Sequence, residues 1–238
     1  MTYRIETLPV NFEKLTALAE AYQTSYCQLS AAYKKRTEMA LYTLAYFYHK
    51  LDSFSKDPSS DVFVLSENEK PVGFVRFSPV PTAYLEAFHG QVLQQEKGVL
   101  DGVSYQWTRR IEFVPGTQIT DRTMILNQLY LSPVVQEKGF GTELLRHTMP
   151  IMLDKYDDFI VEYNLKNTRA MAFYETIGVK PIAKTQDLDH IIDNEKYISE
   201  VGIGYADLRQ TCRKLQQKHL MYLTQAPVIL NPYQRQYV

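Results

Sequence analysis

The chain has few of the features that mark a disulfide-stabilised, metal-binding or membrane protein. Its 238 residues include only two cysteines, Cys27 and Cys212, which are far apart and form no Cys-x-x-Cys pair. We therefore expect neither a disulfide scaffold nor a metal site. No apolar run approaches the roughly 20 residues of a membrane helix, and the N-terminus lacks a basic region followed by an apolar one. These absences predict a cytoplasmic protein with no membrane partner.

The charges are balanced rather than of one sign. Lys and Arg number 26, Asp and Glu number 27, and the formal net charge is −1. Because no overall positive field exists, we expect no nucleic-acid partner. Hydrophobic residues make up 45% of the chain, enough for one sizeable core,. The composition thus predicts a single domain over residues 1–238.

What the chain does contain is a glycine turn between a strand-like run and a helix-like run. The apolar run from Met124 to Leu131 ends at Ser132-Pro133, and Gln136-x-x-Gly139-x-Gly141 then leads into a helical pattern. In such a turn, backbone N–H groups converge on one point and the helix N-terminus adds partial positive charge. The turn can therefore cradle an anion such as a pyrophosphate, although an ordinary strand-to-helix connection also uses glycine.

A second segment gives the turn a more specific meaning. It reads Asn164-Leu-Lys-Asn167-Thr-Arg-Ala170-Met-Ala-Phe173-Tyr174-Glu175-Thr-Ile-Gly178-Val179. Together with the turn, it resembles the Gcn5-related N-acetyltransferase (GNAT) superfamily, over roughly Met124 to Pro181. The resemblance implies an α/β fold of the α+β type, in which helices flank a mixed, mostly antiparallel central sheet with splayed central strands. It also implies acetyl-CoA as the cosubstrate.

Periodicity in the rest of the chain predicts elements that fit this fold. We expect strands at Thr2 to Leu8, Asp61 to Leu65, Pro71 to Phe77 and Phe159 to Tyr163, and helices from Phe12, from near Glu38 and from Asn167 or Thr168. Pro150 should kink or end the helix that follows the glycine turn.

Two further regions extend the minimal family fold. Residues from Pro79 to Arg122 form an insertion, with a predicted helix across Tyr84, Leu85, Phe88, Val92 and Leu93 and a β-run from Val103 to Val114. The insertion either shapes the substrate site or forms a homodimer interface. We expect last strands at Ile182 to Lys184 and Tyr197 to Tyr205, separated by a polar stretch. A helix from Ala206 and an irregular tail from Gln225 form a C-terminal extension.

The resemblance also implies which residues bind coenzyme A. A bulge at about Leu129, Tyr130 and Leu131 would leave backbone groups for the pantetheine arm. The pyrophosphate would lie on the turn formed by Gln136, Glu137, Lys138, Gly139, Phe140, Gly141 and Thr142. Asn164 and Asn167 could hydrogen-bond the pantetheine arm or act only as turn and cap residues, and Ala170 and Phe173 belong to the same motif.

Tyr174 matches the family's general acid. A phenol with an ordinary pKa near 10 stays protonated at neutral pH and can donate to a leaving thiolate. The base is less clear, because Asn127 and Gln128 stand where many members carry a Glu. Glu112 is a candidate, Glu162 matches a position that is often acidic without being the base, and a water relay would need no carboxylate.

The predicted function is transfer of acetyl from acetyl-CoA to a primary amine, on a small molecule or a peptide, in a ternary complex. The alternative is a GNAT-like acyl-CoA-binding or regulatory module without turnover. A nucleotide-binding domain is disfavoured, because the turn has neither a Gly-Lys-Ser/Thr ending nor a Gly-x-Gly-x-x-Gly pattern,.

Overall fold

The strands of the computed structural model form one mixed sheet. The structure describes residues 3–8, 11–31, 42–82, 92–100, 103–113, 119–192, 195–197, 200–222 and 228–230. Within these ranges the sheet order is β11-β1-β2-β3-β6-β7-β10-β8-β5-β4, with β9 paired to β8. The β1–β11 and β6–β7 pairs are parallel and the other pairs antiparallel. This topology confirms the predicted mixed, mostly antiparallel sheet.

The strands run over the following residues: β1 Tyr3–Thr7, β2 Asp61–Glu67, β3 Lys70–Pro79, β4 Val92–Leu100, β5 Val103–Phe113, β6 Thr123–Leu131, β7 Asp158–Asn164, β8 Lys180–Ile192, β9 Glu195–Tyr197, β10 Glu200–Asp207 and β11 Val228–Leu230. The helices are α1 Phe12–Ser30, α3 Leu44–Lys56, α5 Phe140–Met152, α6 Thr168–Thr176 and α7 Leu208–Tyr222, with a 3-10 turn, η1, at Pro133–Val135.

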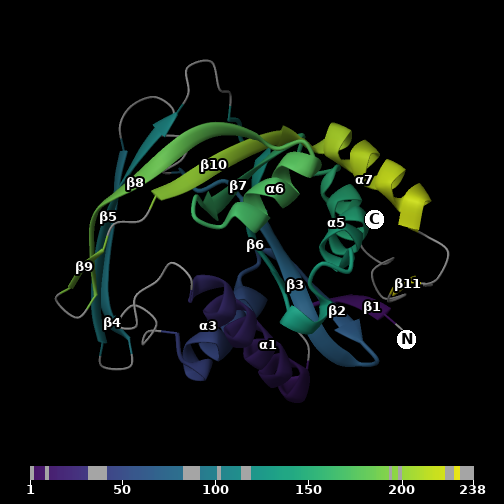
Figure 1. Ribbon diagram of the computed structural model, residues 1–238, viewed down its shortest axis with the longest axis horizontal. Helices are drawn as coiled ribbons and strands as arrows, with labels where there is room; N and C mark the ends of the chain where they lie inside the picture. Colours follow the sequence, from purple (N-terminus) through teal and green to yellow (C-terminus); the bar gives the residue numbers. More distant parts are fainter. Residues whose placement is uncertain are drawn as a thin grey trace.

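Helices cover both faces of the sheet, since neighbouring residues along β2 belong to different cores. Phe63 packs in a cluster with residues of α5 and α7, whereas Val64 packs in a cluster with residues of α1 and α3. Figure 1 shows α1 and α3 together on one side of β3 and β6, and α5, α6 and α7 together on the other. Successive strand side chains point to opposite faces, so the apolar run of β2 serves both layers.

Local sequence signals explain where several helices begin and end. Asn11 caps α1 and Thr43 caps α3, each by accepting a hydrogen bond from the backbone N–H three residues later,. Because Thr43 is the cap, the helix predicted from near Glu38 begins at Leu44 in the structure. Residues 32–41 lie outside the described part of the chain. As predicted, α5 ends at Met152, two residues after Pro150.

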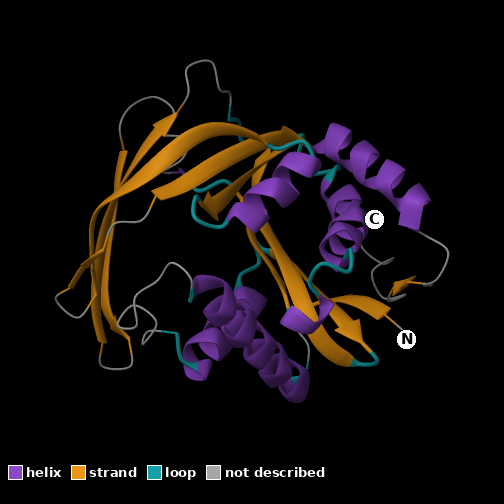
Figure 2. Cartoon of the chain, in the orientation of Figure 1, coloured by secondary structure: helices purple, strands orange, loops and turns teal. Residues whose placement is uncertain are grey.

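The predicted insertion contributes two long strands to one end of the sheet. Figure 2 shows this end as an extended, curved β-structure beside the helical part. The β-run was predicted correctly, since β5 covers Val103–Phe113 and pairs with β4 and β8. The expected helix is wrong at its end, where Val92 and Leu93 belong to β4; residues 83–91 lie outside the described residues.

Two expectations about the C-terminal part are also corrected. The polar stretch expected to separate the last strands is itself largely strand, because β8 continues to Ile192 and β9 pairs back onto it. Cross-strand pairing with β5 supplies the backbone partners that override its polar composition,. The tail contains the short strand β11, parallel to β1. None of the helices in the described ranges is long and apolar enough to cross a membrane.

Candidate active site

The centre of the sheet opens where β6 and β7 separate. These parallel strands pair from Thr123 to Leu126 on β6, and the pairing ends there although β6 continues to Leu131. On its other side, β6 stays paired with β3 up to Leu131. The last residues of β6 therefore present one edge of backbone N–H and C=O groups toward the opening.

The β-bulge of β6 lies two residues before its predicted position. Arg76 of β3 pairs with Gln128, and the next residue of β3, Phe77, pairs with Leu126, which leaves Asn127 as the extra residue,. The segment Leu129–Leu131 keeps regular pairing with β3. Its open edge comes from the departure of β7 rather than from a bulge.

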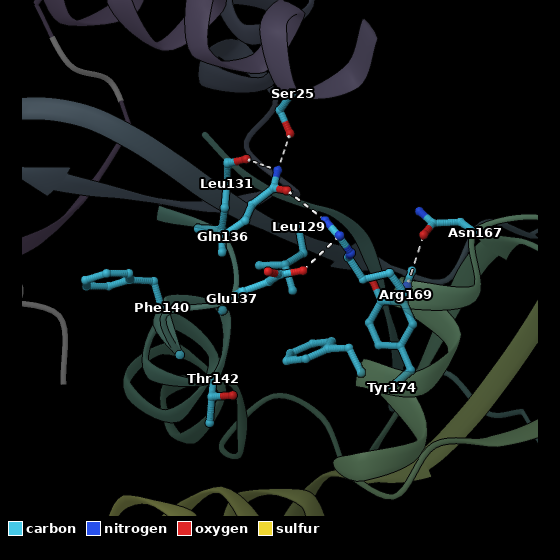
Figure 3. Close-up of a pocket in the computed structure, with 14 residues that line it drawn as sticks. Ser25, Leu129, Leu131, Gln136, Glu137, Phe140, Thr142, Asn167, Arg169 and Tyr174 are labelled. Atoms are coloured by element: carbon cyan, nitrogen blue, oxygen red, sulfur yellow. Dashed lines mark hydrogen bonds and ion pairs between the residues drawn. The ribbon is translucent and has the colours of Figure 1, made fainter. Parts of the chain in front are cut away.

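A cavity of about 300 Å³ lies beside this open edge. Five parts of the chain line it: α1, the end of β6, the loop before α5, the first turn of α5, and α6 with its cap (Figure 3). The lining residues are Ser25, Leu129, Leu131, Gln136, Glu137, Gly139, Phe140, Gly141, Thr142, Asn167, Arg169, Ala170, Phe173 and Tyr174. Apolar side chains thus make up much of the cavity lining, and polar side chains come from α1, the loop, α5 and α6.

The loop before α5 has the backbone of an anion cradle. Gly139 caps α5 with φ +83°, and a Cβ added there would meet no atom within 4 Å. The first hydrogen bond of α5 joins the N–H of Glu143 to the carbonyl of Gly139. The N–H groups of residues 140–142 precede it, at the positive end of the helix dipole and at the cavity wall,.

Gln136 fixes this loop to two other elements. Its Nε2 donates to the carbonyl oxygen of Leu131 at 2.8 Å and to Oγ of Ser25 at 3.2 Å. Its Oε1 accepts from Arg169 at 3.4 Å. One side chain therefore connects the end of β6, helix α1 and helix α6, as Figure 3 shows.

Arg169 also forms an ion pair with the loop. Its guanidinium lies 2.8 Å from Oε1 of Glu137, and both side chains are largely exposed, at 62% and 71%. Glu137 adopts φ +62°, in the left-handed region that is unfavourable for a side chain with a Cβ,. The acidic side chain thus lies beside the same loop whose amides favour an anion.

Tyr174 reaches the cavity from α6. The helix is positioned by Asn167, whose side chain accepts from the N–H of Ala170 at 3.1 Å. The ring of Tyr174 lies 5.5 Å from that of Phe173 and 5.9 Å from that of Tyr163. Burial raises the pKa of the Tyr174 hydroxyl above its ordinary value, so the group is protonated at neutral pH,. It can donate a proton but not accept one.

The structure brings together twelve of the fifteen residues predicted around the turn and the second segment. Tyr130, Lys138 and Asn164 are not part of the cavity lining. The Tyr130 side chain lies on the opposite face of the sheet, 4.3 Å from the Tyr22 ring. Asn164 accepts from the N–H of Lys166 at 2.8 Å, in the role of a turn residue, and Asn167 is a helix cap.

The predicted bases are less well placed. Glu112 lies in β5 opposite Lys184 of β8, and its side chain is outside the described part. Glu162 of β7 pairs with Ile203 of β10 and does not line the cavity. In the described ranges, no group of three His, Cys, Asp or Glu could hold a metal ion.

Two lining residues were missed from the sequence. Arg169 lies inside the second segment, two residues after Asn167, so its motif position was available as a signal. Ser25 gave no signal, because it belongs to α1 and reaches the loop only through the tertiary fold.

The comparisons with known proteins agree with this geometry. Among curated proteins, the search finds no match. Among solved structures, an N-acetyltransferase from Staphylococcus aureus Mu50 is similar at 14% identity and a TM-score of 0.54, over 87% of this chain and 99% of that one. The ribosomal-protein-S18-alanine N-acetyltransferase from Escherichia coli is similar at 14% identity and a TM-score of 0.50, over 87% and 94%.

A third structure, PH1933 from Pyrococcus horikoshii OT3, is similar at 17% identity and a TM-score of 0.52, over 86% of this chain and 99% of that one. At these identities the structures support the fold alone. The sequence model of the acetyltransferase (GNAT) family matches residues 27–179, which include the open edge of β6, the glycine loop and α6. The chain therefore belongs to the GNAT family of acetyltransferases.

Proposed function

We propose that this protein transfers acetyl from acetyl-CoA to a primary amine by direct transfer in a ternary complex. One observation carries the proposal: the glycine loop, the open edge of β6 and the buried Tyr174 meet at a single cavity. The family supplies the cosubstrate and the reaction class. The acceptor is a small-molecule or peptide amine.

The residues of the cavity fit coenzyme A. The open position beside Gly139 and the N–H groups of residues 140–142 suit a pyrophosphate,. The backbone edge of Leu129, Tyr130 and Leu131 suits the amides of the pantetheine arm, and Ala170 and Phe173 offer apolar contact,. The pyrophosphate and the pantetheine arm thus each lie against groups of matching chemistry.

Acetyl-CoA supplies an acetyl group activated as a thioester. In the transfer, the amine nitrogen forms a bond to the acetyl carbon while the bond from carbon to sulfur breaks. Tyr174 gives its phenolic proton to the sulfur, which leaves as the thiol, while the attacking nitrogen releases a proton to solvent and Tyr174 regains one from it. The cavity lining contains neither Cys27 nor Cys212, so we propose no covalent acetyl-enzyme.

The amine must lose a proton before it can attack. Asn127 donates to Ser78 and Gln128 accepts from Arg76, and neither side chain can act as a base. We therefore assign deprotonation to a water relay or to an amine that is already neutral, with Glu112 as the candidate carboxylate.

A second candidate is an acyl-CoA-binding or regulatory module without turnover. The amide side chains at Asn127 and Gln128 favour it, because they occupy the strand where a carboxylate base would lie. Tyr174 opposes it, since a buried phenol at the cavity is the group that turnover requires.

Two measurements test the proposal. Calorimetry of the whole chain should detect coenzyme A binding, and its absence would remove both candidates. Thiol release from acetyl-CoA should then appear with at least one amine from a panel of polyamines, amino acids, aminoglycosides and peptides. Binding without release across the panel would favour the module.

A further inference from the structure

Arg169 has no role in the reaction described above, although it lines the cavity. It is the second residue of α6, and its guanidinium extends toward the loop that precedes α5 (Figure 3). It carries the positively charged side chain of the cavity lining in the part of the chain that the structure describes. Through Glu137 and Gln136, this cation lies beside the loop whose amides suit a phosphate.

The present partner of Arg169 is held weakly. The pair with Glu137 is short, at 2.8 Å, but both side chains are mostly exposed. Exposed pairs of this kind change an equilibrium by about fivefold or less. Glu137 also keeps an unfavourable backbone conformation, with φ +62°, while it makes the pair,. The contact is therefore easily exchanged for a stronger one.

A phosphate is a stronger partner than a single exposed carboxylate. The planar guanidinium can donate two parallel hydrogen bonds to phosphate oxygens, and a terminal phosphate carries a charge of about −1.5 to −2 at neutral pH. Arg169 also donates to Oε1 of Gln136, at 3.4 Å, which holds it against the loop. In contrast, Glu137 brings negative charge to the place where a phosphate would arrive.

We propose that Arg169 binds a phosphate group of coenzyme A, and that Glu137 is its counter-ion until the cofactor displaces it. This inference rests on the proposed function for the identity of the ligand. The phosphate belongs to the pyrophosphate or is the terminal 3′-phosphate. Glu137 thereby lowers the affinity for the cofactor, and Arg169 raises it.

The experiment is calorimetry with coenzyme A on the whole chain and on three variants. Arg169→Gln should raise Kd about tenfold, and Glu137→Gln should lower Kd about two- to fivefold. In the double variant the gain from Glu137→Gln should shrink, because its competition for Arg169 is gone. Two variants serve as controls, Arg213→Gln on α7 and Glu175→Gln on α6. Each removes one charge of the same sign from an exposed side chain outside the cavity.

Two further ligands identify the phosphate. If Arg169→Gln weakens binding of 3′-dephospho-coenzyme A as much as binding of coenzyme A, Arg169 contacts the pyrophosphate. If the effect vanishes, Arg169 contacts the 3′-phosphate.

Unchanged affinity in Arg169→Gln, or weaker binding in Glu137→Gln, overturns the inference while leaving the proposed function intact. If the wild type binds inorganic pyrophosphate in an Arg169-dependent way but not coenzyme A, the proposed function fails and the phosphate site stands. If it binds none of these ligands, both fail.

Discussion

The side-chain amide of Gln136 donates a hydrogen bond to Oγ of Ser25 at 3.2 Å, across 111 residues of sequence. Ser25 is nearly fully buried, with 1% of its surface exposed, so the contact lies in the interior beside the cavity. It fixes the glycine loop to α1, a helix of the opposite layer. The position of the loop therefore depends on the packing of a helix outside the motif.

Replacing Gln136 by alanine should weaken coenzyme A binding about tenfold. The substitution removes two neutral hydrogen bonds, to Leu131 and Ser25, each worth about 1 kcal/mol, and also the longer bond from Arg169,. Ser25→Ala should have a smaller effect, because the bond from Gln136 to the Leu131 carbonyl remains. Calorimetry measures both, with the exposed Gln217→Ala on α7 as the control. Equal affinities in Gln136→Ala and the wild type would show that the loop needs no such anchor.

The two glycines of the loop should respond differently to alanine. Gly139 has φ +83°, so Gly139→Ala should lower the free energy of unfolding by about 1 kcal/mol through backbone conformation alone, since its Cβ meets no atom within 4 Å,. The Cβ of Gly141→Ala would lie 3.5 Å from Leu131 and 3.7 Å from Phe173, which are ordinary contacts. We expect its stability to match the wild type.

Urea denaturation of the two variants tests this difference. A loss of stability in Gly141→Ala as large as in Gly139→Ala would contradict it, because neither added Cβ clashes and only Gly139 has a positive φ. Coenzyme A affinity should fall in Gly139→Ala, where the amides of the cradle must shift.

The residues predicted from the glycine turn and the second segment line one cavity, because the signals that place them are local. A glycine at positive φ, an Asn cap and a Tyr on the same helix are each encoded within a few neighbouring residues. The bulge was misplaced by two residues, since the register of β6 depends on its pairing with β3 rather than on its own composition,.

The parts that the sequence could not predict depend on distant partners. The polar residues of β8 were predicted to form a connection between strands. In the structure, β5 pairs with them and the strand extends to Ile192. The contact of Ser25 with the loop likewise exists only once α1 has packed on the sheet. The position of Arg169 within the second segment is visible in the sequence. Its ion pair with Glu137 could not be predicted, because the pair depends on the conformation of the loop.

Cys212 should react slowly with thiol reagents in the folded protein. Burial raises the pKa of its thiol to about 11, and its surface is 8% exposed. At pH 8 the thiolate is the reactive form, so alkylation should be at least about a hundredfold slower than for an ordinary cysteine with a pKa near 8.5. Mass spectrometry after iodoacetamide treatment, with and without urea, measures the rate at each cysteine.

The same shift predicts a pH dependence of stability. The folded-state pKa is raised, so this thiol contributes stability that is fully present below about pH 8.5 and is lost as the pH rises through about 11,. A Cys212→Ala variant should lose stability less steeply over this window. Rapid alkylation of native Cys212 at pH 8 would contradict the burial on which both expectations rest.

Replacing Tyr174 by phenylalanine should separate catalysis from binding. The variant keeps the ring that packs between Phe173 and Tyr163 but lacks the proton donor. We expect kcat to fall about a hundredfold while the affinity for coenzyme A stays within twofold. Tyr163→Phe is the matched control, because its buried ring lies 5.9 Å from that of Tyr174 and does not line the cavity.

The pH profile adds an independent test of the same group. Burial raises the pKa of Tyr174, so its ionisation should cause no loss of acetyl transfer up to about pH 10 in the wild type,. Transfer is measured in a single turnover, with an acceptor from the amine panel, so that product release does not mask the chemical step. Full turnover in Tyr174→Phe would show that Tyr174 is not the acid. An equal fall of kcat in Tyr163→Phe would show the same, because only the loss of the proton donor itself should slow the transfer.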